Sequence, residues 1–326
     1  MQHPTSPADD SRMHEVASHR ASLTGHCYRI LGSASEADDA VQETMLRAYK
    51  SIARFEARAS LRTWLHRIAT NVCLDALQGR NARVLAMDLS GPSDQDDIAR
   101  FTGDLRALPS STWIEPIADA AALDPSEGLA ARQSIRLAFV AALQHLPPKQ
   151  RAALLLTEVL DCSAKEVAQT LDCTVPAVNS ALQRARVTLA SLGQPSDLET
   201  APQKIDADLL DRYVDAFHRY DVPALTQLLR EDAVMSMPPA SLWFRGRASI
   251  AAWLVGPGLG CRGSRLVPVD VCGTRGFAQY RPRAEGGHQA WALIVLRGEG
   301  SQFREMTYFL DTAAFFPRFG LSLTLP

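Results

Sequence analysis

The pattern of apolar and polar positions changes once along the chain, close to Pro202. Before it, apolar residues recur at spacings of three and four, the period of a helix that is packed on one side. After it, two helical patterns are followed by short strand-like runs separated by glycine turns. This order predicts two all-α domains followed by an α+β domain.

Two helices joined by a short polar turn are predicted between Glu36 and Leu77. The first carries one apolar stripe: Val41, Met45, Ala48 and Ile52. The second repeats the pattern with Leu61, Leu65, Ile68 and Val72. Ser60 stands where its hydroxyl can cap the second helix. With a preceding helix over 15–31, the pair makes a first helical domain over residues 11–83.

The two helices differ in charge. The first opens with Glu36, Asp38 and Asp39, which suit the positive end of a helix dipole. The second is basic and carries an aromatic, a cation and an amide on one strip: Trp64, Arg67 and Asn71. Such a strip can stack on an unpaired base, hold a phosphate and read a base edge. The alternative is a helical hairpin with solvated charges and its tryptophan in the core.

A second helical domain is predicted over residues 129–193. A short helix over 163–170, a tight turn and a longer helix to about Leu192 give a helix-turn-helix pattern, with Thr174 as the cap of the longer helix. The longer helix has a buried stripe: Val178, Leu182, Ala185 and Leu189. Its other side is polar, and from Thr174 to Leu192 it holds two arginines and no acid, which suits an element that faces DNA.

These segments resemble a known family. DDAVQET and RFEARASLRTWLHRIATN are similar to region two of extracytoplasmic-function sigma factors of the sigma-70 family. LPPKQRA, SAKEVA and TVPAVNSALQRAR resemble region four of the same family. Ala57 departs from the glycine that is frequent in the family's region-two turn. The resemblance implies core RNA polymerase and promoter DNA as partners.

The resemblance also implies site residues, by position. The polymerase-docking surface corresponds to Asp38, Asp39, Gln42 and Glu43. The surface that melts DNA and reads the minus-ten element corresponds to Arg62, Trp64, Arg67 and Asn71. The DNA-binding positions that read the minus-thirty-five element are Thr174, Asn179, Ser180, Gln183, Arg184 and Arg186.

An acidic segment over residues 84–128 separates the two helical domains. Residues 88–127 hold nine acids and two bases, a net charge of −7, and four prolines that break any long helix. It is interpreted as a linker, either a solvated, self-repelling tether or, as in sigma factors, a segment that threads the RNA path of the polymerase. Its apolar stretch Trp113–Pro116 indicates docking on another surface, and similar motifs occur in a sigma subgroup with an extra C-terminal domain.

Beyond a hinge over 194–203, residues 204–326 resemble the SnoaL-like, cystatin-related α+β cone, with antiparallel strands after two helices. Its candidate pocket residues are Tyr213, Phe217, Met237, Trp243, Trp291 and Phe309. Four residues are available as general acids or bases: Asp232, Asp270, Asp311 and His288. No sequence arrangement ties any of them to a partner, as a catalytic site would need.

Composition narrows the choice of function. The 326 residues are 46% hydrophobic and 21% charged with net charge −2, so any DNA affinity must come from local charge. The six cysteines lack zinc-site spacing, and no metal or cofactor is predicted. No signal peptide or membrane span is expected, which favours a cytoplasmic protein.

Two functions follow. The first is a sigma factor, not an enzyme, whose C-terminal domain regulates it, with an anti-sigma factor or a small ligand as further partners. The alternative is a SnoaL-type enzyme of the cyclase or hydrolase kind, with the DNA-binding domains as its control.

Overall fold

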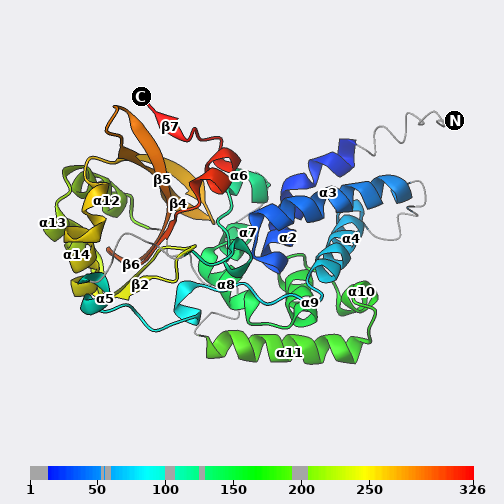
Figure 1. Ribbon diagram of the computed structural model, residues 1–326. Helices are drawn as coiled ribbons and strands as arrows, with labels where there is room; N and C mark the ends of the chain where they lie inside the picture. The colour runs from blue at the N-terminus through cyan, green and yellow to red at the C-terminus, as the bar shows by residue number, and fades with distance from the viewer. Residues whose placement is uncertain (1–13, 53–54, 56–59, 100–106, 125–128, 193–204) are drawn as a thin grey trace. The chain divides into compact units, whose positions relative to one another are not determined.

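The computed structural model describes residues 14–52, 55, 60–99, 107–124, 129–192 and 205–326 (Figure 1). The chain forms two units, each with a core of its own. A helical unit contains Met1–Arg83 and Asp119–Thr200, and a C-terminal unit contains Val84–Ala118 and Ala201–Pro326. Most of the segment between the two helical domains therefore belongs to the C-terminal unit.

Three helices pack on one another in the first helical domain: α2 (Arg20–Leu31), α3 (Ala34–Ser51) and α4 (Leu61–Ala76). The chain is also helical at 14–18, but it breaks at His19, so the helix expected over 15–31 is interrupted. Ser60 caps α4 as predicted, because its hydroxyl accepts a hydrogen bond from the Thr63 amide at 3.1 Å. The turn that contains Ala57 lies outside the described residues.

The second helical domain follows a short helix, α6 (Asp119–Ala122). It consists of α7 (Leu129–Ser134), α8 (Leu137–Gln144), α9 (Pro148–Glu158), α10 (Ala164–Thr170) and α11 (Val175–Ser191). Helices α7 and α8 are separated at Arg136, which is extended, with ψ of 138°. Helix α10 begins with a capping box in which Ser163 and Glu166 bond each other's backbone amides.

The helix-turn-helix prediction is confirmed by α10 and α11. Thr174 caps α11, because its hydroxyl accepts from the Ala177 amide at 3.3 Å. Asp172 takes a left-handed conformation in the tight turn, with φ of 48°. The predicted apolar stripe is buried at every position: Val178, Leu182, Ala185 and Leu189. The opposite face of α11 is therefore left for solvent or for a partner.

The C-terminal unit contains a seven-stranded sheet. Its strands are β1 (Leu229–Ser236), β2 (Trp243–Arg245), β3 (Arg265–Val271), β4 (Thr274–Pro282), β5 (His288–Glu299), β6 (Gln302–Phe309) and β7 (Thr324–Leu325). The order is β2-β1-β6-β5-β4-β3, with β7 beside β5. Strands β1 and β6 are parallel, so the sheet is mixed where antiparallel strands were expected. Trp243–Arg245 forms strand β2, and Arg247 begins helix α14 (Arg247–Val255) after Gly246.

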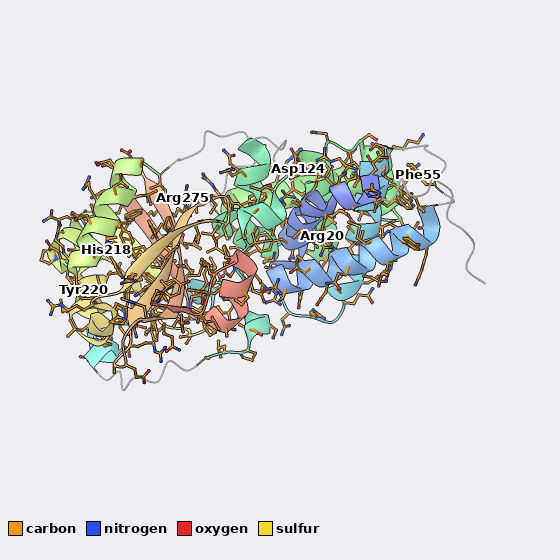
Figure 2. All side chains as sticks on the ribbon, turned by 90° about the horizontal axis from the view of Figure 1, so that it is seen from above. Arg20, Phe55, Asp124, His218, Tyr220 and Arg275 are labelled. Carbon is orange, nitrogen blue, oxygen red and sulfur yellow. The ribbon has the colours of Figure 1, made fainter. Side chains whose placement is uncertain are left out.

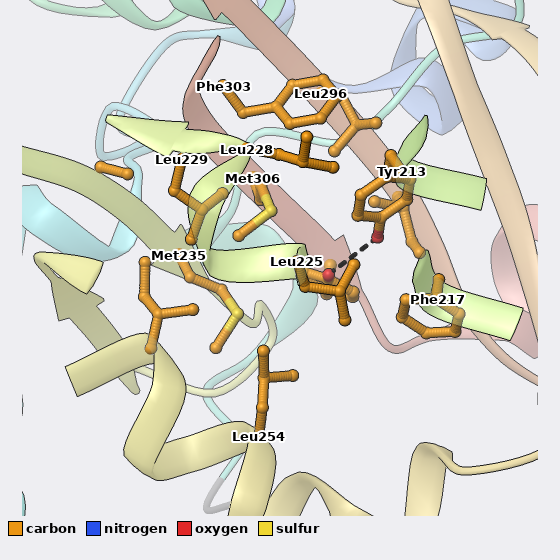
Figure 3. Close-up of a cluster of buried hydrophobic side chains, with 14 of the residues drawn as sticks. Tyr213, Phe217, Leu225, Leu228, Leu229, Met235, Leu254, Leu296, Phe303 and Met306 are labelled. Atoms are coloured by element: carbon orange, nitrogen blue, oxygen red, sulfur yellow. Dashed lines mark hydrogen bonds between the residues drawn. The ribbon is translucent and has the colours of Figure 1, made fainter. Parts of the chain in front are cut away.

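Helices α12 (Ala207–Arg219), α13 (Val222–Gln227) and α14 (Arg247–Val255) pack on one face of this sheet (Figure 1). Their apolar side chains and those of the strands form one buried cluster (Figure 3). Within it the hydroxyls of Tyr213 and Tyr308 are 3.1 Å apart and hydrogen-bonded, which satisfies two buried polar groups. Helix α15 (Thr312–Phe315) packs beside Phe309, whose ring lies 5.9 Å from that of Phe315.

The described parts of residues 84–118, which we call the linker strap, pack on the C-terminal sheet and helices. They contain two short 3-10 turns, η2 (Ala86–Asp88) and η3 (Ser110–Thr112), and helix α5 (Gln95–Ala99). Backbone hydrogen bonds join the C-terminal part of the strap to the domain: Leu108 N donates to Pro239 O, and Cys272 N donates to Ile117 O, each at 2.9 Å. The described strap is thus a docked segment and not a solvated tether.

Apolar side chains complete this docking. Trp113 is buried with Ala86 of the strap and Trp243 of β2 in a small cluster of their own. Ile98, on α5, is buried within the main core of the C-terminal domain. The indole Nε1 of Trp243 donates to the carbonyl of Ser90 at 3.0 Å. The strap therefore supplies part of the apolar interior of this unit.

Candidate nucleic-acid interface

Helix α3 presents the residues predicted to bind polymerase. Asp39 and Gln42 are exposed, whereas Asp38 and Glu43 are half-buried. The Glu43 carboxylate accepts a hydrogen bond from Arg47 Nε at 2.7 Å, an exposed pair one turn apart. Ser33 caps the helix by accepting from the Glu36 amide at 3.1 Å, which fixes where this acidic first turn begins.

Two exposed apolar residues extend this surface. Leu46 and Tyr49 are each 56% exposed, which is unusual for large apolar side chains on a packed helix. They follow Asp39 and Gln42 at helical spacing and so lie on the same side of α3. The sequence analysis did not include these two residues. The available signal was that both fall outside the apolar stripe that it assigned to the core.

Helix α4 carries the predicted DNA-melting residues. Arg62 and Arg67 are exposed, and Trp64 and Asn71 are half-buried. The Trp64 ring packs against Phe55, with centroids 5.1 Å apart and the planes tilted by 42° (Phe55 is labelled in Figure 2). The indole is thus held in place but keeps part of its surface accessible. A base that stacked here would meet a preorganised ring, with the exposed Arg67 one turn further along the helix.

Two further basic residues near this helix form ion pairs with Glu36. Arg80 Nη1 lies 2.7 Å and Arg83 Nη2 lies 3.0 Å from the same carboxylate oxygen of Glu36. Arg83 is buried, so this pair ties the start of α3 to the chain that leaves α4. Arg62 and Arg67 are exposed and are the candidates for contacts with a phosphate backbone.

A pair of buried histidines lies behind the exposed face of α4. His26 of α2 and His66 of α4 meet edge to face, with ring centroids 5.2 Å apart. Burial lowers the pKa of His66 to about 4, although a hydrogen bond from its Nδ1 to the Arg62 carbonyl, 2.8 Å long, opposes the shift. Burial, with a smaller contribution from His66, also lowers the pKa of His26 well below its ordinary value. Both rings are therefore neutral at neutral pH.

Helix α11 presents the predicted base-reading residues on its exposed face: Asn179, Ser180, Gln183 and Arg184. Arg184 Nη1 donates to the Ser180 hydroxyl at 2.5 Å and has no ion pair among the described residues. Arg186 is also exposed, but its Nη2 lies 2.5 Å from the carboxylate of Glu158 on α9. The Arg184 side chain, which among the described residues bonds only a neighbouring hydroxyl of its own helix, keeps donors for a base or phosphate contact, whereas Arg186 holds α11 to α9.

Within the helical unit the two domains meet through buried arginines, which we call the interdomain contact. Arg29 of α2 donates from Nε to the Ser134 hydroxyl at 2.7 Å. Arg151 of α9 donates to the Ile30 carbonyl at the end of α2 and to the side chain of Gln144 at 2.6 Å. Its second nitrogen reaches the carbonyls of Gln144 and Leu146, each at 3.1 Å.

The electrostatics of Arg151 follow from this position. It bonds carbonyls at the C-terminal ends of two helices, where the helix dipole is negative and favours a cation. Burial lowers its pKa to about 10, so it stays protonated at neutral pH. One guanidinium thus joins a helix end of each helical domain.

The six predicted pocket residues do not converge on one cavity. Tyr213, Phe217 and Met237 are buried members of the C-terminal core (Tyr213 and Phe217 are labelled in Figure 3). Trp291 packs at the edge of that core, where the Arg281 guanidinium lies 3.2 Å from its ring centre. Trp243 belongs to the small cluster with Trp113, and Phe309 packs beside α15.

The four candidate acids and bases each have a local partner. Asp232 pairs with Arg230 at 2.9 Å, and Asp270 pairs with Arg275 at 3.4 Å. Asp311 caps α15, and the Nε2 of His288 lies 3.2 Å from the Gly263 carbonyl. Among the described residues no cluster of three or more histidines, cysteines, aspartates or glutamates could hold a metal ion. None of the helices in the described part of the chain has both the length and the apolar character to cross a bilayer.

Comparisons with known proteins agree with this architecture. Residues 16–83 match the model of Sigma-70 region 2, residues 136–189 match Sigma-70, region 4, and residues 210–310 match a SnoaL-like domain. The chain is 42% identical over 325 residues to the ECF RNA polymerase sigma factor SigG of Mycobacterium tuberculosis, covering 97% of this chain and 86% of that protein. It is 32% identical over 168 residues to SigC of the same organism, covering 52% of this chain and 76% of SigC.

A crystal structure of the extracytoplasmic function sigma factor SigJ of Mycobacterium tuberculosis shares the fold. It superposes with a TM-score of 0.62 at 20% identity, covering 96% of this chain and 99% of that one. Sigma factors are transcription factors and not enzymes, in line with the absence of a catalytic arrangement in the sequence. The similarity to SigG over nearly the full length shows that the chain belongs to the family of extracytoplasmic-function (ECF) RNA polymerase sigma factors.

Proposed function

We propose that this chain directs promoter-specific initiation by binding core RNA polymerase through α3 and promoter DNA through α4 and α11. The observation that carries the proposal is the 42% identity to a sigma factor across 97% of the chain. The exposed and half-buried acids of α3, the exposed arginines of α4 and the exposed polar face of α11 support this division of labour. An anti-sigma factor and a cytoplasmic location remain predictions from sequence.

Polymerase docking is tested by charge reversal on α3. The double variant Asp39→Lys, Glu43→Lys should weaken co-purification with core polymerase, because it removes two acids from one exposed side of the helix. Asp208→Lys is the matched control, since Asp208 is an exposed acid on α12 of the other unit. If both variants recover equal amounts of polymerase, α3 is not part of the polymerase interface.

We further propose that the C-terminal domain regulates transcription by holding the linker strap. Trp113 and Ile98 are buried in clusters formed with that domain, and backbone bonds join it to the strap at Pro239 and Cys272. In sigma factors the corresponding linker threads the RNA path of the polymerase. A strap held by the C-terminal domain cannot occupy that path at the same time, so the polymerase-competent arrangement requires its release.

This competition gives the regulation a direction. The strap is divided between a docked and a released population, and any change that favours one lowers the other. Weakening the docking should therefore raise transcription. A ligand or partner of the C-terminal domain would act to the extent that it binds one of the two arrangements better.

The experiment is run-off transcription with purified core polymerase at equal polymerase occupancy. Ile98→Asp places a carboxylate where the side chain is buried in the C-terminal core, so it opposes docking but not release. Leu89→Asp is the matched control, because it makes the same change in the same strap at a side chain that is 43% exposed. We expect more transcript from Ile98→Asp than from Leu89→Asp.

Equal transcript from the two variants would overturn the regulatory proposal and leave the sigma-factor proposal standing. A truncation from Lys204 onward gives a second measurement, because it removes the domain that holds the strap. Identical promoter activity of the truncated and full-length proteins would mark residues 204–326 as a passenger domain. The enzyme alternative gains no support from the geometry, since the four candidate acids and bases have separate local partners.

A further inference from the structure

A groove of about 580 Å³ opens between α12 and the strands β3 and β4 of the C-terminal domain. Its floor is apolar and consists of Leu210, Val214, Leu266 and Phe277. Leu266 and Phe277 belong to the buried core, and the two α12 side chains are packed against it. The groove is therefore a place where the core itself reaches solvent, and its volume suits a small organic molecule.

The rim of the groove is charged. Asp211 and Asp215 lie one turn apart on α12, and His218 follows them, while Arg275 of β4 stands on the opposite side (His218 and Arg275 are labelled in Figure 2). With Asp270 and Arg219 beside this rim, three carboxylates (Asp211, Asp215 and Asp270) face two guanidinium groups (Arg219 and Arg275), and the pairing decides the net charge. That pairing leaves one of the rim groups unneutralised.

Two of the rim charges are already paired. Asp215 accepts from Arg219 Nη1 at 2.6 Å, and Arg275 Nη1 lies 3.4 Å from the carboxylate of Asp270. Asp211 is exposed and has no ion pair among the residues that the structure describes. The unneutralised charge beside the apolar floor is therefore negative, which favours a cation.

An extended peptide is a poorer occupant of this site. Strand β3 ends the sheet order, so its outer edge could in principle accept another strand. However, Pro268 is exposed in the middle of β3 and lacks the N–H that a paired strand needs. A small molecule that lies on the floor does not depend on that missing donor.

We propose that this groove binds a small amphipathic organic cation. Its apolar body lies on Leu266 and Phe277, and its ammonium group pairs with the carboxylate of Asp211. The apolar floor favours a flat, apolar body. The binding itself does not depend on the proposed regulation of transcription, which would be one consequence of it.

The test uses isothermal titration calorimetry on the full-length protein with three matched probes. They are 2-naphthylmethylammonium, 2-naphthylacetate and the neutral 2-naphthylmethanol, which share an aromatic body and differ in charge. We expect the ammonium probe to bind most tightly and the carboxylate most weakly. Asp211→Asn should weaken the ammonium probe by roughly two- to fivefold, as an exposed ion pair allows, and leave the neutral probe unchanged.

Two more variants locate the site. Asp208→Asn is the control, because Asp208 is an exposed acid of α12 that pairs with Arg212 and does not line the groove. Val214→Trp fills the groove and should abolish binding of all three probes while circular dichroism stays native. The proposal is overturned if no probe binds saturably, if the carboxylate binds as well as the ammonium, or if Asp211→Asn and Asp208→Asn behave alike. No polymerase is present, so failure here leaves the regulatory proposal untouched.

Discussion

The interdomain contact of the helical unit and the docking of the linker strap in the C-terminal unit are built from different interactions. The first joins two domains through the buried guanidinium groups of Arg29 and Arg151 and the carbonyls and hydroxyl that accept from them. The second holds its segment through buried apolar side chains, Trp113 and Ile98, and through strand-like backbone bonds. The second contact fixes a segment that the proposed regulation requires to move.

The difference decides how each contact can open. When two hydrogen-bonded groups separate, each can form a hydrogen bond to water instead, so the net free energy of each bond is modest. Apolar surface that separates has no such replacement, and exposing it costs about 25 cal/mol per Å². We therefore infer that the interdomain contact is the easier of the two to open and that the strap needs a partner surface to receive its apolar residues.

Truncation of Trp113 should give the largest effect. Trp113→Ala removes a buried aromatic side chain, which typically costs about 3 kcal/mol or more. Hydrogen exchange at the amides of Leu108 and Cys272, which bond across the docked strap, should accelerate about a hundredfold. Leu89→Ala, at an exposed strap position, should leave both amides unchanged. Unchanged protection in Trp113→Ala would mean that backbone bonds alone hold the strap.

Arg151 tests the other side of the comparison. Arg151→Met keeps the apolar stem but removes donors to Ile30, Gln144 and Leu146, so it should lower the free energy of unfolding of the helical unit by about 2–3 kcal/mol. Urea unfolding followed by circular dichroism measures this loss. The control Arg186→Met breaks an exposed pair with Glu158 and should cost less than about 1 kcal/mol. Equal losses would contradict a special role for the buried guanidinium.

Acid should weaken the helical unit through its buried histidines. The pKa of His66 is lowered to about 4 from an ordinary 6.5, so the unfolded chain binds the proton more tightly. Stability is therefore complete above about pH 6.5 and is lost as the pH falls toward 4. Between pH 7 and 5 the native protein should lose about 2 kcal/mol more than His66→Gln, whose side chain cannot titrate. Parallel pH profiles of the two proteins in urea unfolding would refute this.

Local features of the fold were predictable from sequence because their causes are local. The stripe of α11 is buried at every predicted position because helical period places those residues on one side. Ser60 and Thr174 cap α4 and α11 because a hydroxyl at that position meets free backbone amides.

Long-range features were less accessible. The apolar stretch at Trp113 predicted docking but could not name Trp243, 130 positions along the chain, as its neighbour. Trp243 was instead expected in a pocket, as was Phe309, because an aromatic side chain suits a core, a pocket or an interface equally well. Which of these it joins depends on strand order, and the parallel pairing of β1 with β6 was not visible in the alternation of either strand.

The last prediction asks whether reading DNA requires either contact to open. Asn179, Gln183 and Arg184 are exposed while the interdomain contact is formed, so α11 can meet a major groove without it breaking. Arg184→Ala should therefore lose about 1–3 kcal/mol of discrimination at one position of the upstream element, whereas polymerase binding stays intact. Arg186→Ala should lose less, because that side chain is paired with Glu158. The measurement is run-off transcription on templates that carry every base at each upstream position.

Combining Arg184→Ala with Ile98→Asp then separates DNA recognition from strap release. If the effect of the double variant on transcript yield equals the product of the two single effects, recognition is independent of strap release. If it differs strongly from that product, α11 becomes competent only after the strap has been released.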